Sequence, residues 1–208
     1  MKAHTKETQA TMTPASALQS LKEGNERFQN NIKANRDLKE QVNDTSGGQY
    51  PFATVLSCID SRVPAEMVFD QGLGDIFSAR VAGNFVNEDI LGSMEFACKL
   101  AGTKLIVVLG HTSCGAIKGA CDHAELGNLT KLLEKITPAV NGVEEPKDAS
   151  ERTSKNLTFV DEVSKKNVEL TIDRIHAESP VLAEMEKAGE IKIVGAMYDI
   201  STGAVHFY

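Results

Sequence analysis

The feature that most constrains the fold is a short run at residues 104–110 (KLIVVLG), which has no polar side chain after Lys104. Its β-branched residues and its lack of polar alternation are typical of a strand buried on both faces of a parallel sheet. Residues 51–57 (PFATVLS) read as a second buried strand, and residues 76–81 and 191–198 predict two more. The sequence therefore predicts a mostly parallel central β-sheet.

Helical patterns alternate with these strands. Apolar residues at helical spacing predict a helix at residues 88–100 and a long amphipathic helix around residues 160–175, and a further helix begins near Thr13. Shorter helices are expected at residues 115–120 and 126–136, and a loop at residues 43–49. A turn at residues 201–203 precedes an antiparallel edge strand at residues 204–208.

This alternation predicts an α/β fold, in which helices flank the sheet and a C-terminal antiparallel edge hairpin completes it. No linker or internal repeat divides the chain. We therefore expect a flexible N-terminal arm at residues 1–12 and a single catalytic domain at residues 13–208.

Charge and composition exclude several classes of protein. The formal net charge is −7 and no basic cluster is present, which argues against nucleic acid or an anionic membrane as a partner. The first residues form no apolar signal segment, and no stretch is long enough to span a membrane. We expect a cytoplasmic protein, or a periplasmic one if a signal peptide was removed. The 4 cysteines are too sparse for a disulfide framework.

Two short segments follow predicted strands directly and carry the chemistry. One contains Cys58, Asp60 and Arg62 after the first strand, and the other contains His111 and Cys114 after the central strand. Ligands of parallel α/β sheets bind beyond the carboxyl ends of strands, so the two segments can converge. Two thiolates and one imidazole are a zinc-type ligand set, with a fourth position left for water or for Asp60. The alternatives are a catalytic Cys–His pair or buried core residues, and we interpret Cys98 and Cys121 as structural.

The motif C-x-D-S-R…H-x-x-C-G resembles that of the β-class carbonic anhydrases, and the likeness extends along residues 14–208. It includes GNERF at residues 24–28, CIDSRVPAE at 58–66, GDIF at 74–77, SMEFA at 93–97, and the pairs Tyr198-Asp199 and Thr202-Gly203. The resemblance implies the fold of that family. It also implies zinc-dependent reversible hydration of CO2 to bicarbonate and a proton, by attack of zinc-bound hydroxide on CO2.

By this resemblance, Cys58, His111 and Cys114 hold one Zn²⁺ per chain, and Asp60 and Arg62 form a catalytic dyad. In the open state Arg62 holds Asp60 away from the metal, and in the closed state only, Asp60 itself is a zinc ligand. An ionised Asp60 can only accept hydrogen bonds, so it can orient the attacking hydroxide.

The resemblance also implies substrate-binding residues. Gln49 and the backbone N–H of Gly115 would donate hydrogen bonds to CO2 or bicarbonate, and Phe77, Ala82 and Phe96 would line an apolar CO2 pocket. Some of these residues come from a neighbouring subunit in the family. We therefore expect a homodimer, or a tetramer built as a dimer of dimers, with sites near the subunit interface.

Two other functions compete with this interpretation. A COS or CS2 hydrolase on the same scaffold would use the same zinc chemistry on a similar linear, apolar substrate. A non-catalytic structural zinc protein would prefer four closed protein ligands and would not need Arg62. The absence of a C-x-x-C motif weakens a thiol redox function.

Overall fold

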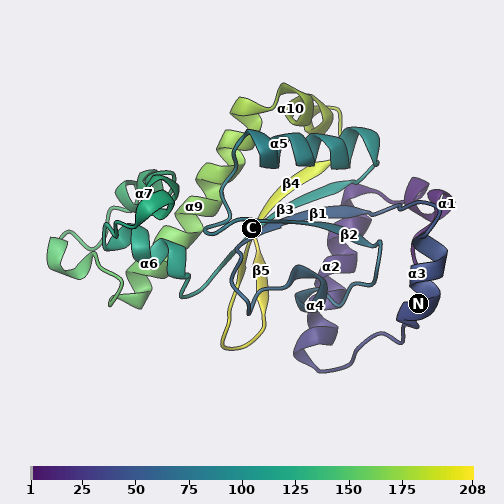
Figure 1. Cartoon of the computed structure of the whole chain (residues 1–208), viewed down its shortest axis with the longest axis horizontal. Helices are drawn as coiled ribbons and strands as arrows, with labels where there is room; N and C mark the ends of the chain where they lie inside the picture. The colour runs from purple at the N-terminus through teal and green to yellow at the C-terminus, as the bar shows by residue number, and fades with distance from the viewer. Residues whose placement is uncertain (1) are drawn as a thin grey trace.

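Five strands form one sheet in the computed structural model, which describes residues 2–208 (Figure 1). Their order across the sheet is β2-β1-β3-β4-β5. Neighbouring pairs among β1 to β4 are parallel, and β5 runs antiparallel to β4. The strands are β1 (Ala53–Ser57), β2 (Ile76–Arg80), β3 (Leu105–His111), β4 (Lys192–Tyr198) and β5 (Val205–Phe207). The predicted fold class is confirmed, with the apolar run at the centre of the sheet.

Helices cover both faces of the sheet (Figure 1). One face packs against α2 (Pro14–Gln29) and α4 (Ala65–Val68). The other packs against α5 (Glu88–Glu95), α9 (Leu157–Glu178) and α10 (Pro180–Lys187). Alternate residues of β3 face the two layers, so every residue of this strand is buried. This double burial explains why the strand reads as a continuous apolar run.

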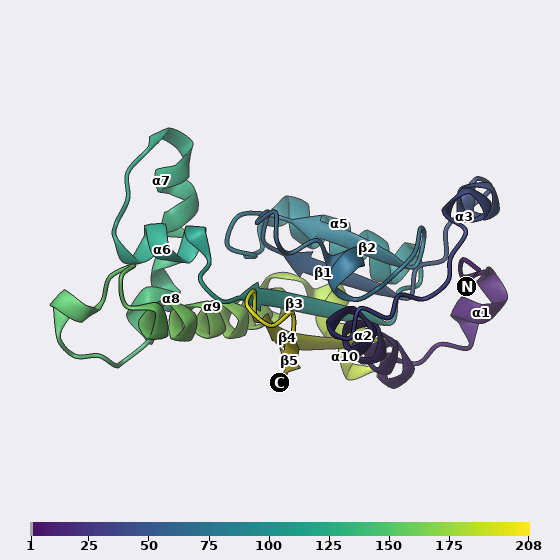
Figure 2. The ribbon, with the colours of Figure 1, turned by 90° about the horizontal axis from the view of Figure 1, so that it is seen from below.

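A lobe of short helices extends beyond the carboxyl ends of the strands (Figure 2). It contains α6 (Gly115–Cys121), α7 (Gly127–Glu134), α8 (Thr137–Gly142) and the 3₁₀ turn η2 (Ala149–Glu151). The apolar core of this lobe includes Cys58 and Cys114 together with Ile117, Ile136 and Val160. The lobe therefore packs against the strand ends where the two motifs lie.

Some local structure differs from the expectation. The helix predicted at residues 88–100 changes to a π-helical turn, η1 (Phe96–Leu100), after α5. The loop predicted at residues 43–49 is in part helical, because α3 (Leu38–Thr45) extends into it. This helix was missed because it buries only Gln41 and so has no apolar stripe, although Asp37 caps its first turn. Helices α8 and α10 were not predicted, although Ser179 caps α10 and a proline stands in the first turn of each helix.

The N-terminal segment lies against the domain. Residues Lys6–Ala10 form the short helix α1, and the side chain of Gln9 donates hydrogen bonds to the carbonyls of Pro51 (2.6 Å) and Ala101 (2.8 Å). The flexibility expected of residues 1–12, and the single catalytic domain expected at residues 13–208, stay predictions. None of the helices in the described residues is both long and apolar enough to cross a membrane.

Candidate metal centre

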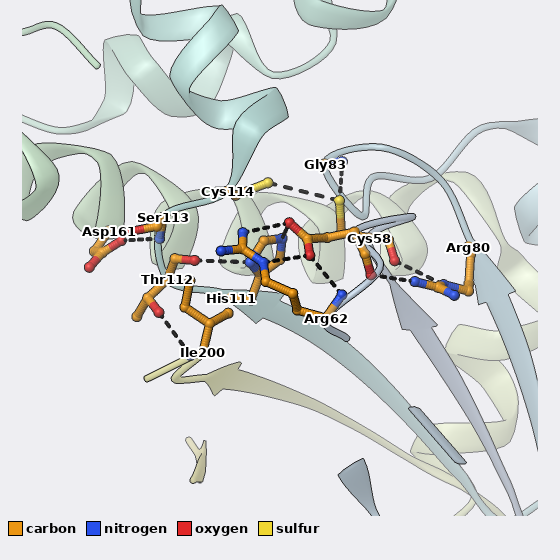
Figure 3. Close-up of polar contacts among 11 residues, drawn as sticks. Cys58, Arg62, Arg80, Gly83, His111, Thr112, Ser113, Cys114, Asp161 and Ile200 are labelled. Atoms are coloured by element: carbon orange, nitrogen blue, oxygen red, sulfur yellow. Dashed lines mark hydrogen bonds and ion pairs between the residues drawn. The ribbon is translucent and has the colours of Figure 1, made fainter. Parts of the chain in front are cut away.

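The parallel register brings the two motifs together. Ser57, the last residue of β1, pairs with Leu109 of β3, so Cys58 follows β1 next to the point where β3 ends in His111. Cys114 is the N-cap of α6, three residues further along the chain. All three residues are buried. Two segments that are far apart in the sequence thus place their side chains together at the carboxyl ends of β1 and β3 (Figure 3).

The geometry of these three side chains suits a metal ion. One ligand atom from each of Cys58, His111 and Cys114 lies within 4.8 Å of the others. The two sulfur atoms are 3.9 Å apart. Two thiolates bound tetrahedrally at the usual Zn–S length would lie about 3.8 Å apart. The cluster therefore has the size that a zinc site needs.

The orientation of His111 points to the same conclusion. Its Nδ1 lies 2.9 Å from the carbonyl oxygen of Thr112, so Nδ1 carries the proton and donates it there. Nε2 is buried and has no hydrogen-bond partner among the described residues. A buried polar atom without a partner costs free energy, and a metal ion would satisfy this one.

The electrostatics of the thiols favour a bound cation. A hydrogen bond shared with Cys114 lowers the pKa of Cys58, and His111 and the backbone N–H of Gly83 act in the same direction. Sharing that hydrogen bond raises the pKa of Cys114, as does burial. A divalent cation held between the two sulfur atoms would stabilise both as thiolates.

Backbone contacts hold the two ligand segments in place. Arg80 donates from Nε to the carbonyl of Cys58 (3.0 Å) and from Nη2 to that of Asp60 (2.7 Å). Thr112 donates its N–H to the carbonyl of Tyr198 (3.0 Å), and its hydroxyl accepts from the N–H of Ile200 (3.1 Å). Both contacts of Thr112 tie the second segment to β4 and to the turn after it.

Asp60 is held by Arg62 rather than by the cysteines. Arg62 donates from Nε to Oδ1 (2.9 Å) and from Nη2 to Oδ2 (2.7 Å), and its backbone N–H also donates to Oδ1 (2.9 Å). These bonds, above all those from the guanidinium, hold the pKa of Asp60 well below its usual range. Oδ2 of Asp60 lies 3.9 Å from Nε2 of His111, so an ionised carboxylate borders the cluster.

The remaining predicted site residues fall into two groups. Ala82 and Gly115 lie near the cluster, since Ala82 adjoins Gly83 and Gly115 begins α6 directly after Cys114. Phe77 and Phe96 lie elsewhere, with ring centres 6.2 Å apart, and line a cavity of about 640 Å³. Phe77 pairs with Thr54, the second residue of β1. At the usual rise of a strand, the four residues from Thr54 to Cys58 span about 13 Å.

Gln49 also lies away from the cluster of its own chain. It is exposed and precedes the amino end of β1, whereas Cys58 follows the carboxyl end. Cys98 and Cys121 are buried in the apolar core, and burial raises the pKa of each to about 11. Neither belongs to the cluster.

Sequence reasoning missed two polar residues that support the cluster, Asp161 and Asn167. Asp161 accepts a hydrogen bond from the N–H of Ser113, and Asn167 donates one to the carbonyl of Gly83. Both lie in α9, where the pattern of apolar residues gave no sign of a role at the site. Only the packing of α9 beside the strand ends reveals them.

Comparison with known proteins shows where the chain belongs. A profile of the carbonic anhydrase family matches residues 53–205. The chain is 37% identical over 200 residues to carbonic anhydrase 2 of Mycobacterium tuberculosis, covering 91% of this chain and 90% of that protein. It belongs to the β-class carbonic anhydrase family. The predicted family is thereby confirmed, and with it the enzyme class, because carbonic anhydrases are lyases.

Other relatives agree with this assignment. A carbonic anhydrase of Mycolicibacterium smegmatis is 36% identical over 199 residues, with 92% of both chains covered. A crystal structure from a study of two tetrameric β-carbonic anhydrases of Sordaria macrospora shares the fold at a TM-score of 0.69. That chain is 22% identical, and the match covers 93% of this chain and 94% of that one. Hydration of CO2 is the general reaction of the family, and the Cys-His-Cys cluster is compatible with its zinc.

Proposed function

We propose that this β-carbonic anhydrase hydrates CO2 reversibly to bicarbonate and a proton, with one zinc ion held by Cys58, His111 and Cys114. The observation that carries the proposal is the buried Nε2 of His111, which has no hydrogen-bond partner among the described residues and belongs to a cluster with two sulfur atoms 3.9 Å apart. Zinc supplies one function when bound: it lowers the pKa of a coordinated water to about 7, so that CO2 can be attacked at neutral pH.

Asp60 and Arg62 orient the reaction in this proposal. Arg62 keeps Asp60 ionised and donates to both of its carboxylate oxygens, so that a water rather than Asp60 would take the fourth position of the metal. The ionised carboxylate would accept, at Oδ2, a hydrogen bond from the attacking water. This bond would turn a lone pair of the water oxygen toward CO2. In this proposal the resting chain is in the open state, with Asp60 off the metal. The N–H of Gly115 would donate to an oxygen of the substrate, and Ala82 would border it.

The direct test is stopped-flow hydration of CO2 at pH of about 7, where about half of a zinc-bound water would be ionised, and at about 8.5, where nearly all of it would be. The protein is assayed for zinc beforehand. We expect fast hydration that is higher at the higher pH, disappears when a chelator removes the metal, and returns with added zinc. Protein that carries one zinc per chain and yet hydrates no CO2 at either pH would contradict the proposal and favour a COS or CS2 hydrolase or a structural zinc site.

We propose further that the site is completed by a second copy of the chain, in a homodimer or a dimer of dimers. Gln49, Phe77 and Phe96 lie away from the cluster of their own chain, and Phe96 is 50% exposed. Phe77 lies in β2, the edge strand of the sheet, and Phe96 packs against it. Gln49 precedes Phe52, whose N–H bonds to the residue before β2. A partner docked at this edge would receive Gln49 as a hydrogen-bond donor for CO2 and the two rings as part of its apolar pocket.

Subunit complementation tests this arrangement. A dimer is purified in which one chain carries Gln49→Ala and the other carries Asp60→Asn, using a different affinity tag on each. One of its two sites then combines an intact metal centre with an intact partner Gln49, so we expect about half the wild-type rate. Each variant alone is expected to be slow. A mixed dimer no faster than the two parents would show that Gln49 does not act across the interface.

A further inference from the structure

Helix α9 packs closely against strands β3 and β4. Val168 of α9 lies over Gly110 of β3 and Gly195 of β4. A Cβ atom at Gly110 would lie 2.7 Å from Cγ2 of Val168, and one at Gly195 would lie 3.0 Å from Cγ1. The two glycines therefore permit an approach that a larger residue would block. This contact sets the distance between the helix and strands β3 and β4.

From this position, Asp161 reaches the segment that carries two of the ligands. Its Oδ1 accepts a hydrogen bond of 2.8 Å from the N–H of Ser113 (Figure 3). Ser113 lies between His111 and Cys114 and has a φ of 54°. This left-handed conformation is unfavourable for a residue other than glycine, so it needs support from its surroundings. Asp161 supplies that support where the chain turns from one ligand to the next.

Asn167 reaches the third ligand through one intermediate residue. Its buried Nδ2 donates a hydrogen bond of 2.8 Å to the carbonyl of Gly83, and the N–H of Gly83 lies 3.4 Å from Sγ of Cys58, to which it donates. Asn167 thus orients the residue that donates to the thiolate. Asp161 and Asn167 are separated by about 9 Å along the helix axis, which lets one helix contact both ligand segments.

We propose that α9 is a brace for the metal centre, with Asp161 and Asn167 as positioning residues that hold the three ligands in binding geometry. This inference rests on the zinc site proposed above and adds the part of the chain that sets its affinity. Neighbours that orient metal ligands typically account for 10- to 100-fold in affinity. The brace acts on the ligands before the metal arrives, since its hydrogen bonds involve only protein atoms.

The test measures zinc affinity by competition with a chromophoric chelator, independently of catalysis. Asp161→Ala and Asn167→Ala are each expected to raise the dissociation constant by about 10- to 100-fold. Asp161→Asn retains a side-chain oxygen that can accept from Ser113, and should stay within about threefold of the wild type. Asp173→Ala removes an exposed carboxylate of the same helix and is the matched control. The absorption bands of cobalt-loaded protein should change in the two alanine variants alone.

Folding is checked separately by circular dichroism and urea unfolding of the metal-free proteins. Wild-type zinc affinity in a folded Asp161→Ala variant would overturn the brace, as would equal losses in Asp161→Ala and Asp161→Asn. Zinc binding without CO2 hydration in the wild type would refute the proposed function and leave this test intact. A wild-type chain that binds no zinc would overturn both.

Discussion

Replacing Cys58 by serine is expected to abolish stoichiometric zinc binding. The serine hydroxyl is a poor zinc ligand, and it leaves the unpartnered Nε2 of His111 and one sulfur to hold the ion. Removing a ligand should lower zinc affinity more than removing a residue that only orients a ligand. We therefore expect zinc affinity to fall by more than about 100-fold. Metal content is measured by atomic emission after gel filtration, and affinity by chelator competition.

The thermal stability of Cys58→Ser should decrease because the variant no longer binds zinc. Binding to the native state alone stabilises it by about 2.7 kcal/mol when free zinc is 100 times the dissociation constant, and the serine variant loses this contribution. Cys121→Ser is the matched control, since Cys121 is a buried thiol of the same lobe outside the cluster. It should cost some stability and keep its zinc. Retention of one zinc per chain by Cys58→Ser would refute the ligand assignment.

Replacing Asp60 by asparagine is expected to remove most of the activity and keep the zinc. The asparagine amide is nearly the same size and can still accept from Arg62, so the fold and the three ligands should persist. However, its NH2 group would donate a hydrogen bond where the carboxylate oxygen accepts one from the attacking water. We expect a decrease in kcat/KM of about 10²-fold or more, the usual scale for a group that handles a proton at the reacting atom.

Stopped-flow hydration of CO2 on protein of known zinc content measures this effect. Asp173→Asn makes the same chemical change at an exposed position of α9 and should have wild-type activity. Full activity of Asp60→Asn would remove Asp60 from the mechanism. A loss of zinc in that variant would instead indicate that Asp60 contributes to the metal site in its resting arrangement.

Local patterns in the sequence determined the strands and the chemistry at their ends. The apolar, β-branched run before His111 is typical of a strand buried on both faces, and β3 is buried throughout. Strands of such a sheet end at one edge, so Cys58, His111 and Cys114 could be predicted to meet although they lie far apart in the chain. The short polar helix α3 was missed, because periodicity reveals a helix only where one side of it is apolar.

Only the tertiary structure decided what surrounds the ligands. Asp161 and Asn167 resemble any polar residues of an amphipathic helix, and they gain a role because Gly110 and Gly195 let α9 approach the sheet. Likewise, the separation of Gln49 from Cys58 follows from their places at opposite ends of β1, which is a property of the assembled sheet. The residue types of the proposed ligands, and their places at the ends of strands, can be read locally in the sequence. Ligand support depends on contacts between distant segments, which exist only after the chain has packed.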